Sequence, residues 1–206
     1  MAEAGAGGTQ RARLAILISG RGSNMAALID AAARDDCPYE VALVVSNRPD
    51  APGLAYAAAH GIPQFAASHK GMTREAFDRL IDGALRDAGA DYVALAGYMR
   101  VLSPWFVTAW AGRLVNIHPS LLPAYKGLDT HARAIAAGDA RHGCTVHLVT
   151  EALDDGPILA QAEVPVLPGD DEEALAQRVL IEEHRLYPRA LADLIRSKAA
   201  VQAGSR

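Results

Sequence analysis

The sequence is poor in aromatic residues, carries no excess of positive charge and has no long hydrophobic run. Only 5% of its 206 residues are aromatic, and the formal net charge is −4. Nucleic-acid-binding surfaces are usually basic and rich in stacking rings, so these figures do not favour a nucleic-acid partner. No apolar run approaches the ~20 residues that cross a bilayer, and the first residues lack the apolar core of a signal peptide. We therefore expect a cytoplasmic protein without a membrane partner.

Cysteine is equally scarce. Cys37 and Cys144 lie far apart, and neither belongs to a C-x-x-C motif. A disulfide framework or a zinc site is therefore not predicted, and both residues are interpreted as small, buried apolar side chains. No other cluster of ligating residues predicts a metal site.

Half of the residues are hydrophobic, which is enough for one compact domain with a core and a cleft. Residues 1–11 are rich in glycine and alanine and predict a flexible leader. A single domain is expected over residues 12–197, followed by a frayed C-terminal tail over residues 198–206.

Continuous apolar runs alternate with helical patterns along the chain. The runs predict strands at residues 13–19, 40–46, 62–67, 91–97, 113–118, 144–149 and 158–166. Helical spacing predicts helices at residues 25–34, 53–60, 73–88 and 171–196. This alternation is typical of an α/β fold: a doubly wound, mostly parallel, Rossmann-like sheet flanked by helices. Ligands of such sheets bind outside the carboxyl ends of the strands.

A glycine-rich loop, Gly20–Asn24, lies between the first strand and the first helix. Glycines allow a tight turn, and free amides at a helix N-terminus attract an anion. A dinucleotide site is not favoured, because Met25 stands where the third glycine of that motif would be. Two interpretations remain, a site for one phosphate at Gly22, Ser23 and Asn24, or an ordinary helix cap.

Asn116 and His118 lie two residues apart at the end of a predicted strand, so both side chains face one side. An asparagine amide can stabilise an oxyanion, and a histidine can supply a proton near neutral pH. Asp154 lies in a predicted turn from which its carboxylate could reach the imidazole and stabilise its charged form. The alternative is structural: a hydrogen-bonded strand-end histidine and an ordinary turn aspartate.

Five stretches, in one order along nearly the whole chain, resemble the phosphoribosylglycinamide formyltransferase family. They are LISGRGSN (17–24), LAGYMRVLSP (95–104), LVNIHPSLLPAYKGLDTHARAI (114–135), GCTVHLVTEALDDGPILAQ (143–161) and EEHRLYP (182–188). The resemblance implies the formyltransferase fold and transfer of a formyl group from 10-formyltetrahydrofolate to the amine of glycinamide ribonucleotide, without a metal. A homodimer is a further expectation from the resemblance.

The resemblance also assigns residues. The catalytic residues are Asn116, His118 and Asp154. The contacts to the ribonucleotide are Gly22, Ser23, Asn24 and Glu183. The contacts to the folate are Arg74, Met99, Arg100, Val101, Leu102, Asn116, Thr150, Glu151, Ala152, Leu153 and Asp154. His131 and His147 match recurring positions of the family and are interpreted as supporting residues. The structural alternatives are that the charged residues are solvated helix charges and that the apolar ones belong to the core.

The sequence departs from the family's pattern at Ala124, Lys126 and Asp155. The first two fall in a loop that is expected to be exposed. Asp155 places a second carboxylate beside Asp154, which either alters the electrostatics at His118 or points to solvent.

Three other functions would explain part of this pattern. A 10-formyltetrahydrofolate hydrolase would use the same three residues with water as the nucleophile, but its family carries an additional N-terminal domain. A methionyl-tRNA formyltransferase would carry an additional C-terminal domain. A non-catalytic nucleotide sensor would explain the phosphate loop, but not Asn116, His118 and Asp154 together.

Overall fold

A computed structural model describes residues 11–204 of the chain. The strands are β1 (Ala12–Ile18), β2 (Tyr39–Ser46), β3 (Gln64–Ala66), β4 (Tyr92–Leu95), β5 (Leu114–His118), β6 (Arg141–Leu148) and β7 (Ile158–Pro165). The helices are α1 (Ser23–Ala32), α2 (Gly53–Ala59), α3 (Arg74–Asp87), α4 (Pro104–Ala109), α5 (Thr130–Ala137) and α6 (Glu172–Gly204).

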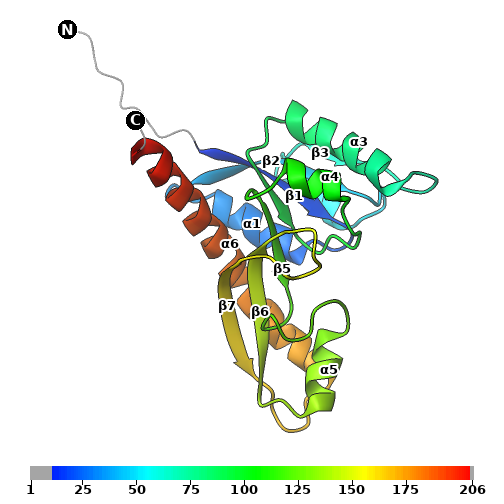
Figure 1. Cartoon of the computed structure of the whole chain (residues 1–206), viewed down its shortest axis with the longest axis vertical. Coiled ribbons are helices and arrows are strands. Elements are labelled where there is room, and N and C mark those ends of the chain that lie inside the picture. The colour runs from blue at the N-terminus through cyan, green and yellow to red at the C-terminus, as the bar shows by residue number, and fades with distance from the viewer. Residues whose placement is uncertain (1–10, 205–206) are drawn as a thin grey trace.

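The strands form one seven-stranded sheet in the order β3-β2-β1-β4-β5-β6-β7 (Figure 1). Pairing is parallel from β3 to β5 and antiparallel for β5 with β6 and β6 with β7. The chain order reverses between β1 and β4, and this is the point where ligands of doubly wound sheets bind. The predicted mostly parallel α/β sheet is confirmed.

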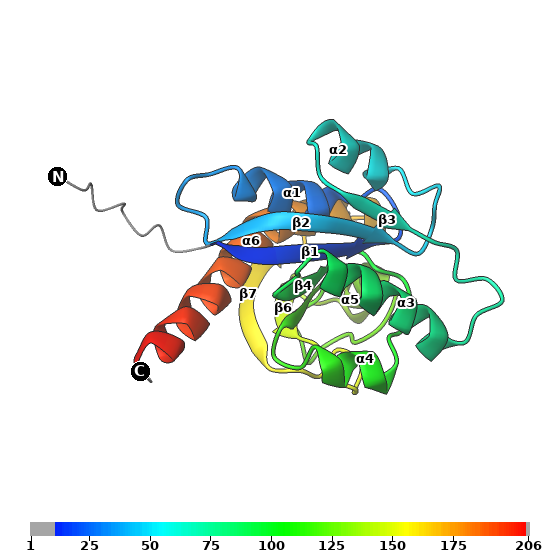
Figure 2. The same ribbon diagram turned by 90° about the horizontal axis from the view of Figure 1, so that it is seen from above.

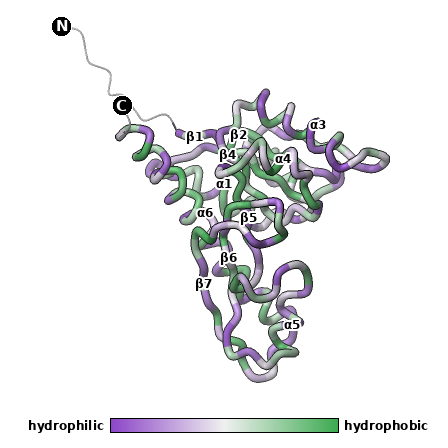
Figure 3. Tube along the Cα trace, viewed as in Figure 1, coloured by the Kyte–Doolittle hydropathy of each residue, from purple (hydrophilic) through white to green (hydrophobic). Residues whose placement is uncertain are grey.

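Helices cover both faces of the sheet (Figure 2). On one face, α1, α2 and α6 pack over a cluster that includes Ile16, Ile18 and Val115. On the other face, α3 and α4 pack over a cluster that includes Leu17 and Val45. Successive residues of β1 therefore pack into the cores on opposite faces of the sheet, which explains why this strand is a continuous apolar run. Figure 3 shows hydrophobic residues along these central strands and hydrophilic ones along the outer part of β7.

Several elements differ from the sequence prediction. The short helices α4 and α5 were not predicted, and β6 begins at Arg141 rather than at residue 144. The last helix continues to Gly204, so residues 198–204, where the sequence predicts a frayed tail, are helical. Alanines in this stretch favour helix.

Most of the predicted leader, residues 1–10, lies outside the described residues. Arg11, its last residue, donates hydrogen bonds to the carbonyls of Tyr39 and Ala32. Between residues 11 and 204, no helix has the length and apolar content needed to cross a membrane.

Candidate active site

The loops that leave β1 and β4 are joined where the sheet order reverses. Ser19, directly after β1, donates its backbone N–H to Gly97 O at 3.2 Å. Its hydroxyl accepts from Met99 N at 2.8 Å and donates to Asn47 Oδ1 at 2.7 Å. Ser19 is 6% exposed and connects three strand ends. It was not among the predicted site residues, because a single serine after a strand is no motif.

The predicted phosphate loop opens α1 as expected. Gly22 is the N-cap of α1 with φ 73, a left-handed conformation that suits glycine. A side chain at Gly22 would also meet the Met25 side chain at 2.9 Å. Ser23 and Asn24 therefore lie in the first turn, where backbone amides have no partner within the helix.

Glu183, from α6, lies beside this loop. Asn24 Nδ2 donates to its carboxylate at 2.7 Å, although the two residues are 159 positions apart. Glu183 is 7% exposed, and burial raises its pKa, which the hydrogen bond from Asn24 partly offsets. The other amide atom of Asn24, Oδ1, is buried without a partner among the described residues. A polar ligand with a donor group would satisfy it.

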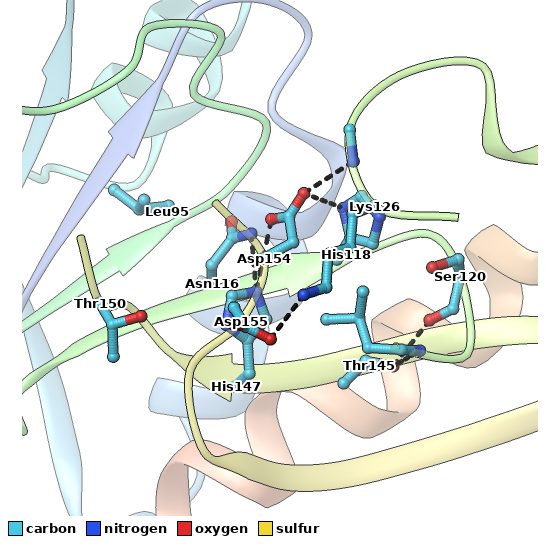
Figure 4. A network of polar contacts seen from close by, with 12 residues as sticks. Leu95, Asn116, His118, Ser120, Lys126, Thr145, His147, Thr150, Asp154 and Asp155 are labelled. Atoms are coloured by element: carbon cyan, nitrogen blue, oxygen red, sulfur yellow. Dashed lines mark hydrogen bonds and ion pairs between the residues drawn. The ribbon is translucent and has the colours of Figure 1, made fainter. Parts of the chain in front are cut away.

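Asn116 on β5 lies opposite His147 on β6 (Figure 4). His147 is 2% exposed, and burial lowers its pKa, so the ring is neutral. Its Nδ1 lies 2.9 Å from Leu148 O and must donate, because a carbonyl only accepts. Nε2 is then an acceptor, and Asn116 Nδ2 donates to it at 3.2 Å. His147 thereby fixes the orientation of the Asn116 amide.

His118 lies between two acceptors. Its Nε2 donates to Tyr125 O at 2.9 Å, and its Nδ1 lies 3.5 Å from Asp154 Oδ2 (Figure 4). Only an imidazolium carries a hydrogen on both nitrogens, so this arrangement suits the charged ring. The His118 side chain is 7% exposed and that of Asp154 8%, so little water screens the pair.

The loop between β6 and β7 holds Asp154 in place. Asp154 has φ 48, and its Oδ2 accepts from Gly127 N at 3.0 Å. Its other oxygen, Oδ1, lies 3.7 Å from His147 Nε2. Gly156 packs so closely on β6 that a side chain there would lie 1.7 Å from Leu148 O. The structure therefore brings Asn116 and His118, from β5, together with Asp154, from the loop after β6.

Two loops with exposed apolar side chains flank these residues. Met99 is 69% exposed and Val101 57%, on the loop after β4. Leu153, on the loop after β6, is 62% exposed. The backbone groups of residues 100–102 make no hydrogen bond within the described chain. An apolar ligand with polar edges fits such a setting.

The remaining predicted contacts lie around the same two loops. Arg74 is the first residue of α3, next to Thr73, whose carbonyl accepts from Arg100 at 3.4 Å. Thr150 donates to Ala152 O at 3.3 Å within the second loop, and Glu151 is exposed there.

Two of the residues that depart from the family's pattern, Lys126 and Asp155, form an ion pair near the site. Lys126 Nζ donates to Asp155 Oδ1 at 2.5 Å, which joins the loop after β5 to the loop after β6 (Figure 4). The charge of Asp155 is therefore balanced by Lys126 beside Asp154. The Asp155 side chain is also 56% exposed, so it lies at the surface.

His131 lies beside His142 rather than in contact with Asn116, His118 or Asp154. Its Nδ1 is 3.1 Å from His142 Nε2, and the rings meet edge to face. His142 also meets the ring of Tyr125, whose carbonyl accepts from His118. The sequence analysis missed both His142 and Tyr125, since only the folded loop brings them to the site.

Within residues 11–204, no group of three or more His, Cys, Asp or Glu side chains is arranged to hold a metal ion. Cys37 and Cys144 are both buried and free, and burial raises the pKa of the Cys144 thiol to about 12.

Comparison with known proteins agrees with this geometry. A model of the formyl transferase family matches residues 12–191. This chain belongs to the formyl transferase family. It is also similar to solved structures. One is the crystal structure of phosphoribosylglycinamide formyltransferase from Brucella melitensis, which is 52% identical in sequence with a TM-score of 0.87. The match covers 90% of this chain and 96% of that one.

Other formyl transferases are similar over most of this chain. The Escherichia coli phosphoribosylglycinamide formyltransferase is 47% identical over 176 residues, which are 85% of this chain and 83% of that protein. The Drosophila melanogaster trifunctional purine biosynthetic protein adenosine-3 is 50% identical over 196 residues. This match covers 93% of the chain but only 14% of the larger protein, so the chain corresponds to a small part of that relative.

Proposed function

We propose that this protein transfers the formyl group of 10-formyltetrahydrofolate to the amine of glycinamide ribonucleotide in purine biosynthesis. The observation that carries the proposal is the meeting of His118, Asp154 and Asn116 at the carboxyl edge of the sheet. On the same edge lies a phosphate loop with a buried carboxylate beside it. A cytoplasmic location and a homodimer belong to the same proposal, and sedimentation tests the second.

The ribonucleotide binds at the N-terminus of α1. The amides of Ser23 and Asn24 and the loop around Gly22 receive its phosphate, because a helix N-terminus favours an anion. Glu183 accepts hydrogen bonds from the ribose hydroxyls. Asn24 Nδ2 is held by Glu183 at 2.7 Å, and its Oδ1, which has no partner among the described residues, accepts a hydrogen bond from the ligand.

The folate binds between the loops after β4 and β6. The unpaired backbone groups of residues 100–102 are suited to the polar edge of the pterin. The exposed side chains of Met99, Val101 and Leu153 are suited to its apolar faces. Arg74, at the outer end of this region, provides positive charge for the glutamate of the folate.

The nucleophile is the substrate amine, so no covalent enzyme intermediate forms. Holding the amine against the formyl carbon can contribute ~7–11 kcal/mol of the barrier. Negative charge then develops on the formyl oxygen, where the Asn116 amide and the charged His118 stabilise it. Asp154 balances the charge of His118 and assists proton transfer to the departing folate nitrogen.

His118 must exchange one hydrogen-bond partner to act in this way. In the structure its Nε2 donates to Tyr125 O at 2.9 Å, while Asp154 faces Nδ1. The formyl oxygen would replace the Tyr125 carbonyl as the acceptor from Nε2. The Tyr125 carbonyl, in the loop after β5, therefore moves away from His118 when the substrates bind, whereas Asp154 remains beside Nδ1.

Steady-state turnover with 10-formyltetrahydrofolate tests the proposal, with glycinamide ribonucleotide, glycinamide riboside or buffer alone as the acceptor. Folate release that requires the ribonucleotide is expected. In His118→Ala the rate falls by roughly 10²–10³, the usual cost of losing one oxyanion donor. Folate release in buffer alone would identify a hydrolase instead, and binding of both ligands without release would identify a sensor.

A further inference from the structure

The backbone of the segment from Met99 to Ser103, in the loop after β4, is hydrogen-bonded to side chains elsewhere in the described chain at its two ends. At its start, Met99 N donates to Ser19 Oγ at 2.8 Å. At its end, Ser103 N donates to Asp78 Oδ2 at 2.6 Å. The backbone of residues 100–102, between these points, makes no hydrogen bond within the described chain. The second attachment therefore sets where this free backbone lies.

Asp78 is an unusual residue to find at this place. It lies on the buried side of α3 and is 0% exposed, although aspartate is rarely fully buried without a charged partner. No ion pair joins it to another of the described residues, and its Oδ1 has no hydrogen-bond partner among them. A buried carboxylate held in this way is costly for stability alone.

The groups around Asp78 come from this loop and from the start of α3. Burial raises the pKa of Asp78, and the hydrogen bonds from Ser103, followed by the charges of Arg100 and Arg74, oppose that shift. Arg100 Nε and the Tyr98 hydroxyl are also buried without partners in the described chain. Asp78, Tyr98 and Arg100 also interact electrostatically with one another. Two unsatisfied donors and one unsatisfied acceptor therefore belong to one group of neighbouring residues, and they complement one another chemically.

We propose that Asp78 is a positioning residue for folate binding: it holds the Ser103 end of the loop and attracts Arg100, so that residues 100–102 present their backbone to the pterin. This inference rests on the proposed function. Asp78 touches no substrate itself, and its effect on binding is transmitted through Ser103 and Arg100.

The same helix supplies a matched control. Asp82 lies one turn after Asp78 and is 7% exposed. It accepts hydrogen bonds from Trp110 Nε1 at 2.9 Å and from Arg86 Nε at 2.6 Å. Asp82 is therefore a buried, hydrogen-bonded carboxylate on the same face of α3, but its partners lie outside the folate loop.

The experiment compares the intact protein with Asp78→Asn and Asp82→Asn. Calorimetry gives the Kd for tetrahydrofolate, kinetics give the KM for glycinamide ribonucleotide, and thermal unfolding gives the Tm. We expect Asp78→Asn to weaken tetrahydrofolate binding by roughly tenfold, with the KM for the ribonucleotide within twofold. Asp82→Asn lowers the Tm and leaves the Kd within twofold.

A second pair of variants tests the other partner of the contact. Ser103→Ala removes the hydroxyl, which caps α4 and also interacts with Asp78, whereas Ser103→Pro additionally removes the N–H that donates to Asp78. Weaker tetrahydrofolate binding in Ser103→Pro than in Ser103→Ala supports the inference, even if Asp78→Asn does not fold. Equal binding in both pairs overturns it. A wild-type protein that binds no tetrahydrofolate overturns the proposed function itself.

Discussion

His142 should make the stability of the protein depend steeply on pH. The residue is 1% exposed and is the second residue of β6. Burial, together with the neighbouring His131, lowers the pKa of His142 from 6.5 to about 4. The folded protein therefore keeps this ring neutral in a range of pH where the unfolded chain binds a proton.

The sign of the effect follows from this difference. Because the pKa is lower in the folded state, stability is fully present above pH 6.5 and is lost as the pH falls toward 4. Each pKa unit corresponds to about 1.4 kcal/mol, so the loss due to His142 is about 3 kcal/mol over this range. Below pH 4 the folded state also binds the proton, and the loss ends.

The assay is urea unfolding at several pH values for the wild type and His142→Gln. The variant cannot bind the proton, so its stability should fall by about 3 kcal/mol less than that of the wild type between pH 6.5 and 4. Parallel profiles for His142→Gln and the wild type would refute the reasoning.

Two further predictions concern catalysis and substrate binding. In His147→Leu the Asn116 amide loses the acceptor that orients it, so kcat should fall by roughly 10²-fold while the KM for glycinamide ribonucleotide changes little. Single-turnover kinetics check this, and an unchanged rate would separate His147 from catalysis. In Glu183→Gln the ribose loses one of the two acceptor oxygens of the carboxyl group, so the KM for the ribonucleotide should rise roughly tenfold at similar kcat. An increase in the KM for the folate instead would place Glu183 in the other half of the site.

The central strands were predictable because each one is buried on both faces. Ile16 and Leu17 face opposite cores, so β1 consists of apolar residues without interruption. The same regularity predicted the doubly wound sheet, which is confirmed, and the edge at which we propose that its ligands bind. Asn116 and His118 were predictable as well, because alternate residues of a strand face the same side.

The short helices were harder to predict. α4 has six residues and α5 has eight, too few for a clear periodic pattern. A local signal for α4 was present, since Ser103 accepts from Phe106 N and Pro104 follows it at the first helical position. For α5 the N-cap is Asp129 with φ 57 and no capping hydrogen bond, so the usual signal is missing.

The sequence by itself determined the class of fold, the alternating strands and helices, and the residues that follow each strand. These features depend on local patterns of burial, which a single segment carries. Only the tertiary structure decided which of these residues meet. Glu183 reaches Asn24 across 159 positions, Lys126 balances Asp155, and the Tyr125 carbonyl accepts from His118. These contacts depend on where loops and helices pack on the sheet. The number of residues between two positions does not give the distance between them in space.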